Sequence, residues 1–104
     1  MPMIHVLAII TAHPGMRGRI LEAWRGNAAA VRAEDGCLQY EAVIDAAQAL
    51  PGMARFGDDT FVVVERWASL AALQAHAVAP HMKAYASQVK AWTANRAIHV
   101  LDPA

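Results

Sequence analysis

The sequence predicts an α+β fold in which one antiparallel sheet carries its helices on one face. Its 104 residues are enough for a single domain, which we assign to residues 1–104. Apolar runs of strand length alternate along the chain with segments that repeat at helical spacing. The composition, 57% apolar and 17% charged, argues against a disordered chain. This apolar fraction is also more than the interior of so small a domain can bury, so we expect the surplus apolar surface to lie at an interface.

The first half of the chain predicts a strand, a helix and a second strand. Residues 3–12 are almost continuously apolar, contain β-branched residues and stop before Pro14, which favours a short strand. Residues 16–35 place apolar side chains at helical spacing, and Gly36 suits the left-handed position just after a helix. Residues 37–44 then alternate weakly between apolar and polar, as a second strand would.

The second half predicts a long loop, a strand, a helical region and a last strand. Residues 45–59 contain the proline, glycines and paired aspartates that are typical of a loop. Residues 60–67, with four consecutive apolar residues near their centre, predict the clearest strand. The helical region begins after Ser69, a candidate cap, and is interrupted at Pro80, which can start a new helix. Residues 97–101 form the last predicted strand.

At this length, the order strand-helix-strand-strand-helix-strand is typical of a ferredoxin-like sandwich. In that fold both helices cover one face of four antiparallel strands and leave the other face open. Residues 6–10 and 61–64, in the first and third strands, are apolar on both faces. We therefore predict that a second copy of the chain covers the open face, so that the protein is a homodimer.

Charge, hydropathy and cysteine content exclude several classes of protein. Nine basic and nine acidic residues cancel, so we expect no nucleic-acid partner. No window holds 18 uninterrupted apolar residues, so we expect no membrane span. The single cysteine, Cys37, excludes an internal disulfide and a cysteine zinc site. The first residues lack a basic region and a cleavage signal, and we expect a cytoplasmic protein.

Two histidines, His76 and His81, stand on either side of Pro80 and are the main candidates for chemistry. They are five residues apart, with a proline between them and no carboxylate nearby, which argues against a metal site. Imidazole titrates near neutral pH, so His76 is a candidate general base that faces a pocket. The alternative interpretation is that His76 is a half-exposed histidine at a helix end with no chemical role. Glu65 lies in an apolar strand and needs a partner, for which we expect Arg66 or another arginine.

Three segments resemble the antibiotic-biosynthesis-monooxygenase family, and the similarity covers essentially the whole chain. Residues 34–40, Glu-Asp-Gly-Cys-Leu-Gln-Tyr, resemble the start of the second strand in these domains. Residues 65–67, Glu-Arg-Trp, together with the two histidines and the tyrosine of residues 75–85, resemble the second signature of the family. Residues 98–103 are similar to the quinol (menadiol) monooxygenase subgroup.

The resemblance implies a dimer of ferredoxin-like chains whose sheets face each other in an α/β barrel. It also implies oxidation of quinols or polycyclic phenols by dioxygen, with a base and an apolar cavity in place of flavin, haem or metal. We accordingly expect no cofactor, no metal and a small aromatic substrate. On this resemblance, His76 and His81 are catalytic. The substrate-binding residues are expected to be Trp67, Tyr85, Met82, Phe61 and Tyr40.

The sequence leaves two other functions open. The same small dimeric scaffold resembles that of isomerases and degradation enzymes that also use histidines. A non-catalytic dimer that binds an aromatic metabolite would need the same kind of pocket. Oxygen consumption on addition of a reduced naphthoquinone separates the monooxygenase from both alternatives.

Overall fold

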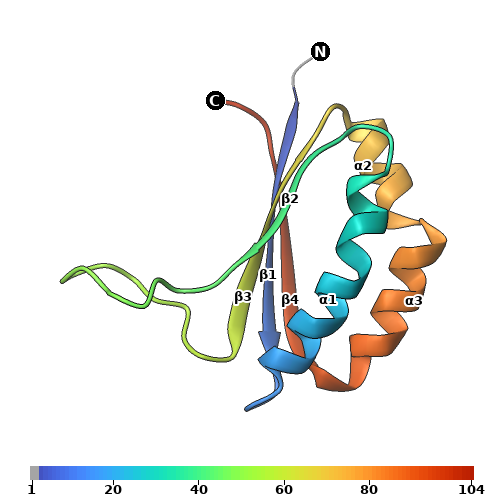
Figure 1. Ribbon diagram of the computed structural model, residues 1–104. Helices are drawn as coiled ribbons and strands as arrows, with labels where there is room; N and C mark the ends of the chain where they lie inside the picture. Colours follow the sequence, from blue (N-terminus) through green and yellow to red (C-terminus); the bar gives the residue numbers. More distant parts are fainter. Residues whose placement is uncertain (1–2) are drawn as a thin grey trace.

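The computed structural model describes residues 3–104 and has one four-stranded antiparallel sheet with its helices on one face (Figure 1). The strand order, β2-β3-β1-β4, is that of a ferredoxin-like fold, so the predicted fold class is confirmed. In chain order the elements are β1 (Ile4–Ala12), α1 (Arg17–Arg32), β2 (Cys37–Val43), β3 (Thr60–Trp67), α2 (Leu70–Ala77), α3 (Pro80–Val89), the 3₁₀ helix η1 (Lys90–Trp92) and β4 (Thr93–Leu101).

The last strand begins earlier than the sequence predicts. β4 starts at Thr93 rather than at residue 97, because Asn95 and Arg96 already pair with β1. The polar character of this segment makes it look like a loop. Backbone pairing with a long neighbouring strand overrides that weak preference. The extension matters for function because it brings polar and charged side chains next to the helices.

The helical region divides at Pro80, as predicted. The hydroxyl of Ser69 accepts a hydrogen bond from the backbone N–H of Ala72, 3.1 Å away, and caps α2. Pro80 is the first residue of α3, where a backbone N–H would have no partner within the helix. The break places one histidine in the last turn of α2 and the other at the start of α3. No helix within residues 3–104 is long and apolar enough to cross a membrane.

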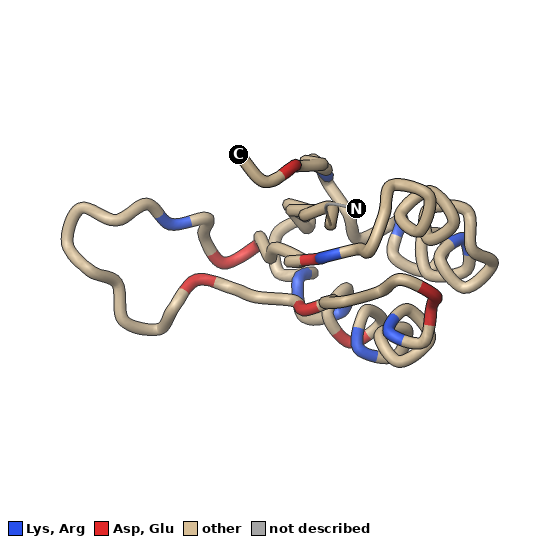
Figure 2. Tube along the Cα trace, turned by 90° about the horizontal axis from the view of Figure 1, so that it is seen from above, with Lys and Arg blue, Asp and Glu red and all other residues tan. Residues whose placement is uncertain are grey.

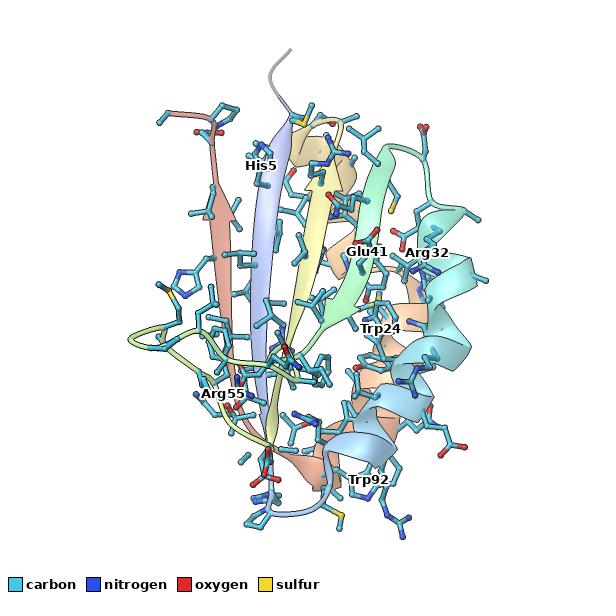
Figure 3. All side chains as sticks on the ribbon, turned by 60° about the vertical axis from the view of Figure 1, so that its left-hand side comes forward. His5, Trp24, Arg32, Glu41, Arg55 and Trp92 are labelled. Atoms are coloured by element: carbon cyan, nitrogen blue, oxygen red, sulfur yellow. The ribbon has the colours of Figure 1, made fainter. Side chains whose placement is uncertain are left out.

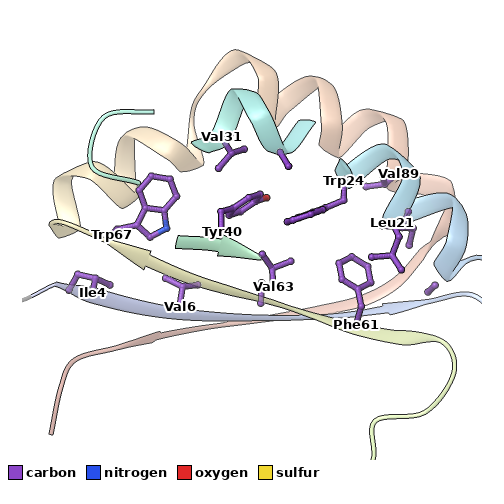
Figure 4. Packing of buried hydrophobic residues seen from close by; sticks show 14 residues of the cluster. Ile4, Val6, Leu21, Trp24, Val31, Tyr40, Phe61, Val63, Trp67 and Val89 are labelled. Atoms are coloured by element: carbon purple, nitrogen blue, oxygen red, sulfur yellow. The ribbon is translucent and has the colours of Figure 1, made fainter. Parts of the chain in front are cut away.

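The core fills the space between the sheet and the helices (Figure 4). Phe61 and Trp67 of β3 are completely buried in it. Burying a large aromatic side chain contributes about 1.5–3 kcal/mol, so these two residues are central to stability. The residues of α1 that the helical spacing predicts to face the core are all buried: Ile20, Trp24, Ala28 and Val31.

A tight turn joins α1 to β2 and depends on Gly36. The backbone N–H of Cys37 donates to the carbonyl of Glu34, 3.2 Å away, and Gly36 has a φ of +84°. Only glycine adopts this left-handed conformation without strain. A Cβ atom on Gly36 would lie 2.6 Å from the Cβ of Ala72 in α2. The glycine therefore also allows α2 to pack closely against the turn.

Gly36→Ala is expected to lower the free energy of unfolding by about 2–5 kcal/mol. About 1–2 kcal/mol comes from the left-handed backbone, and about 1–3 kcal/mol comes from the clash with Ala72. Gly52→Ala is the matched control, because Gly52 has a φ of +80° but nothing within 4 Å of the added Cβ. It should show the backbone cost alone in urea unfolding. Equal losses for the two variants would contradict the role assigned to the contact with Ala72.

The face of the sheet opposite the helices has no helix over it (Figure 3). His5 projects from this face, which we call the open face. Side chains alternate along a strand, so Leu7 points away from the buried Val6 and Ala8 and lies on the open face. Leu7 is 36% exposed and pairs with Val64 of β3. The open face therefore presents apolar side chains at its centre.

The long loop predicted for residues 45–59 is present and includes residue 44, and it projects away from the helices (Figures 1 and 2). Asp45 closes the base of the loop, because its carboxylate accepts hydrogen bonds from the N–H groups of Phe56 (3.0 Å) and Gly57 (2.8 Å). These two bonds lower the pKa of Asp45. The loop exposes large apolar side chains, namely Ile44, Leu50, Met53 and Phe56.

Candidate active site

A cleft of about 690 Å³ lies between the sheet and the helices α2 and α3. Val6 and Ala8 of β1 line it on the side of the sheet, and Met82 and Tyr85 line it from α3. The first residues of β4 and Ile98 also line it. Ile98 is 46% exposed, since the helices leave much of β4 uncovered. Its size and its mainly apolar lining suit a small aromatic molecule.

His76 lines this cleft from the last turn of α2 and is buried. The centroid of its ring lies 4.6 Å from that of Trp67 and 5.8 Å from that of Tyr40. Its Nδ1 lies 2.9 Å from Oε2 of Glu34, whereas Nε2 makes no hydrogen bond within residues 3–104. The imidazole is therefore held by three neighbours, and one of its nitrogens is left for a ligand.

Glu34 contacts both candidate histidines. Its Oε2 lies 2.9 Å from Nδ1 of His76 and 2.8 Å from Nε2 of His81. The expectation that no carboxylate lies nearby is therefore wrong. Glu34 follows α1 and is 42 and 47 residues away from the two histidines in the sequence, which is why their spacing does not reveal it. Among the described residues, no group of three or more His, Cys, Asp or Glu side chains is arranged to hold a metal ion.

His81 does not line the cleft that His76 lines. It lines a separate groove between α1 and α3, together with Asn27 and Trp92. Its side chain is 30% exposed, whereas that of His76 is 8% exposed. The two histidines predicted to be catalytic thus share one carboxylate but face different pockets.

Glu65 brings a buried carboxyl group from β3 to the cleft. The predicted arginine partner is wrong, because the indole N–H of Trp67 donates to Oε1 of Glu65 over 2.9 Å. Residues two apart in a strand share a face, so this pairing follows from the β3 geometry. Burial raises the pKa of Glu65, although the hydrogen bond from Trp67 and the nearby His76 both lower it. Glu65 therefore keeps its proton to a higher pH than an exposed glutamate.

Glu65→Gln is expected to stabilise the protein near pH 8, by on the order of 1 kcal/mol, and to have little effect near pH 4. The raised pKa means that the folded chain binds this proton more tightly than the unfolded chain. Stability therefore falls as the pH rises from the ordinary value of 4.5 through the raised pKa, and glutamine removes that loss. Urea unfolding at both pH values tests this. Glu22→Gln, at an exposed position on α1, is the control. An equal change in the free energy of unfolding of Glu65→Gln at both pH values would contradict the raised pKa of Glu65.

Two tyrosine hydroxyl groups also belong to the cleft. Burial raises the pKa of Tyr85 to about 12, although the guanidinium of Arg96 lowers it. Burial also raises the pKa of Tyr40, and the charge of Glu65 adds to this effect. Both hydroxyls stay protonated at neutral pH and can donate hydrogen bonds. The ring of Tyr40 stacks on Trp24, with 5.0 Å between the centroids, which fixes its position.

The structure brings together some predicted site residues but not all. His76, Tyr40, Met82 and Tyr85 line the cleft. Trp67 and Phe61 do not, because both are completely buried in the core; Trp67 reaches the cleft only through its contacts with His76 and Glu65.

Among the unpredicted residues that line the cleft are an indole and three cations. The helical spacing predicts Trp24 as a core residue of α1, yet it also lines the cleft, with its buried Nε1 close to the hydroxyl of Tyr40. Three cations also line it: Lys83, Lys90 and Arg96. Glu65 is the one acidic residue among the residues that line the cleft, so the cations outnumber it three to one and make a local excess of positive charge. This excess favours an anion in the cleft.

The fold and the site define a small ferredoxin-like domain whose cleft, between sheet and helices, combines apolar walls with one buried histidine. Residues 3–88 match the family described as antibiotic biosynthesis monooxygenase. The chain belongs to this family, which confirms the resemblance drawn from its motifs.

Individual relatives match over almost the whole chain. The protein named probable quinol monooxygenase YgiN, from Escherichia coli strain K12, is 34% identical over 103 residues, covering 97% of this chain and 98% of its own. The crystal structure of PA3566 from Pseudomonas aeruginosa superposes with a TM-score of 0.82 at 28% identity, covering 100% of this chain and 96% of that one. Rv0793 from Mycobacterium tuberculosis gives a TM-score of 0.79 at 27% identity, with coverage of 98% and 95%. The family membership makes a monooxygenase-like function the coarse assignment.

Proposed function

We propose that this protein is a monooxygenase that oxidises a quinol or a related phenol with dioxygen and without a cofactor. The observation that carries the proposal is His76, a buried imidazole in an apolar cleft with Nδ1 engaged by Glu34 and Nε2 left for a ligand. The similarity to a relative named for quinol oxidation supports the same substrate class.

In the proposed reaction, Nε2 of His76 accepts a phenolic proton from the bound quinol. The quinolate is electron-rich and passes electrons directly to dioxygen. One oxygen atom enters the ring and the other leaves as water, so one quinol and one dioxygen give one hydroxylated quinone and one water. Lys83, Lys90 and Arg96 favour the anionic intermediate, and the apolar walls keep bulk water away from it.

The tyrosine hydroxyls and the indole of Trp24 provide donors for the substrate oxygens. Tyr85 stays protonated, and the indole N–H of Trp24 is buried close to the hydroxyl of Tyr40. A quinol oxygen in the cleft can accept a hydrogen bond from either of these donors.

The proposal also includes a homodimer formed through the open face and a cytoplasmic location. Burial raises the pKa of the Cys37 thiol, which makes this thiol less reactive at neutral pH.

The proposed function is tested by oxygen uptake with chemically reduced naphthoquinones, in the presence of superoxide dismutase to suppress spontaneous oxidation. We expect the protein to accelerate uptake, and with ¹⁸O₂ the product should contain one labelled oxygen atom. Unchanged uptake in the presence of protein that binds the quinol would contradict the proposal and favour a binding protein.

A further inference from the structure

We propose that Glu34 is the positioning residue of this site: it holds His76 with the proton on Nδ1 and the lone pair on Nε2, and His81 is the second anchor of the same carboxylate. The inference deepens the proposed function, because it explains how a base is presented to the cleft. It assigns His81 a role outside the cleft.

The geometry at Glu34 restricts the protonation of both rings. A single oxygen, Oε2, lies 2.9 Å from Nδ1 of His76 and 2.8 Å from Nε2 of His81. An ionised carboxylate only accepts hydrogen bonds, so each of these nitrogens must carry a proton. In a neutral His76 the lone pair is then on Nε2, the nitrogen that makes no hydrogen bond within residues 3–104.

The carboxylate is held in place by its own backbone. The N–H of Glu34 donates to the carbonyl of Val31 over 2.9 Å, and its carbonyl accepts from Cys37 in the turn that Gly36 allows. The side chain of Glu34 is 13% exposed, so the contacts to both histidines are largely shielded from water. The turn after α1 is thereby connected to the end of α2 and the start of α3.

Packing prevents His76 from exchanging its two nitrogens by rotation. Trp67 and Tyr40 pack against its ring, and a rotated ring would lose the bond to Glu34 in a buried site. A base held in one tautomer and one orientation needs no rearrangement before it accepts a proton. His81, in the groove between α1 and α3, fixes the carboxylate from its other side.

The first test needs no substrate. Imidazole ¹⁵N spectra of the labelled protein are recorded at a pH of about 8.5, above the ordinary range for imidazole. We expect His76 with its proton on Nδ1 in the wild type and in Asp35→Asn. Asp35 is exposed in the same turn, so this control removes the same charge without touching the contact. In Glu34→Gln the amide can also donate, so the preference should be lost. A proton on Nε2 of neutral His76 in the wild type would overturn the proposal.

The second test uses turnover. Glu34→Gln should lower kcat on the order of ten- to a hundred-fold with little change in KM, because Glu34 acts through His76 and does not line the cleft. His81→Ala removes the N–H that Glu34 accepts and should lower kcat, whereas His81→Gln keeps a side-chain N–H for Glu34 and should recover most of that loss. Equal activity of Glu34→Gln and Asp35→Asn would overturn the positioning role, and equal activity of His81→Ala and the wild type would overturn the anchor role. If the wild type oxidises no quinol, the proposed function fails, and the spectra still decide the role of Glu34.

Discussion

His76→Ala should lower the turnover of a quinol by roughly a hundred- to ten-thousand-fold, the usual range for loss of a general base. The reason is that His76 lines the cleft and its Nε2 makes no hydrogen bond within residues 3–104, while the other histidine at Glu34 lines a different groove. Oxygen uptake at saturating quinol, measured between pH 6 and 8, gives the effect on kcat.

Two controls separate the loss of a base from the loss of structure. His13→Ala removes an exposed histidine in the turn after β1 and should turn over like the wild type. Free imidazole added to His76→Ala can enter the space left by the ring and should restore part of the activity. Near-full activity of His76→Ala across this pH range would show that the base assignment is wrong.

Most of the fold follows from local sequence signals. The run of β-branched residues predicts β3 with the bounds that the structure has, and Pro80 marks the start of α3 because its ring fits only the first turn of a helix. The end of α1 differs, because the helix stops at Arg32 instead of residue 35 and Gly36 lies in the turn that follows. The start of β4 differs too, since residues 93–96 carry no strand pattern and are ordered by pairing with β1.

The site follows from the sequence less well, because it depends on contacts between distant segments. The motif resemblance makes His76 a candidate base, but Glu34 comes from a turn 42 residues earlier, and no spacing rule connects the two. Trp67 illustrates a second difficulty. An aromatic residue at the end of a strand can face a cavity or the core, and here it is completely buried and donates to Glu65 instead of contacting the cleft directly.

A homodimer through the open face is the second prediction with a large expected effect, and Leu7→Asp should abolish it. Leu7 lies near the centre of the open face and pairs with Val64. An obligate interface of roughly 2,000 Å² or more would bury both side chains. The loop of residues 44–59 adds exposed apolar side chains that a partner chain could cover.

In a two-fold dimer the substitution occurs twice, and each buried unpaired carboxylate costs roughly 3–5 kcal/mol. The dissociation constant should therefore rise by at least about four orders of magnitude. Sedimentation at micromolar concentration is expected to show a dimer for the wild type and a monomer for Leu7→Asp. Leu70→Asp is the matched control, because Leu70 is 51% exposed on α2, on the other side of the sheet, and its variant should stay dimeric. A wild-type monomer at this concentration would refute the dimer. A Leu7→Asp variant that stays dimeric would show that the interface lies elsewhere.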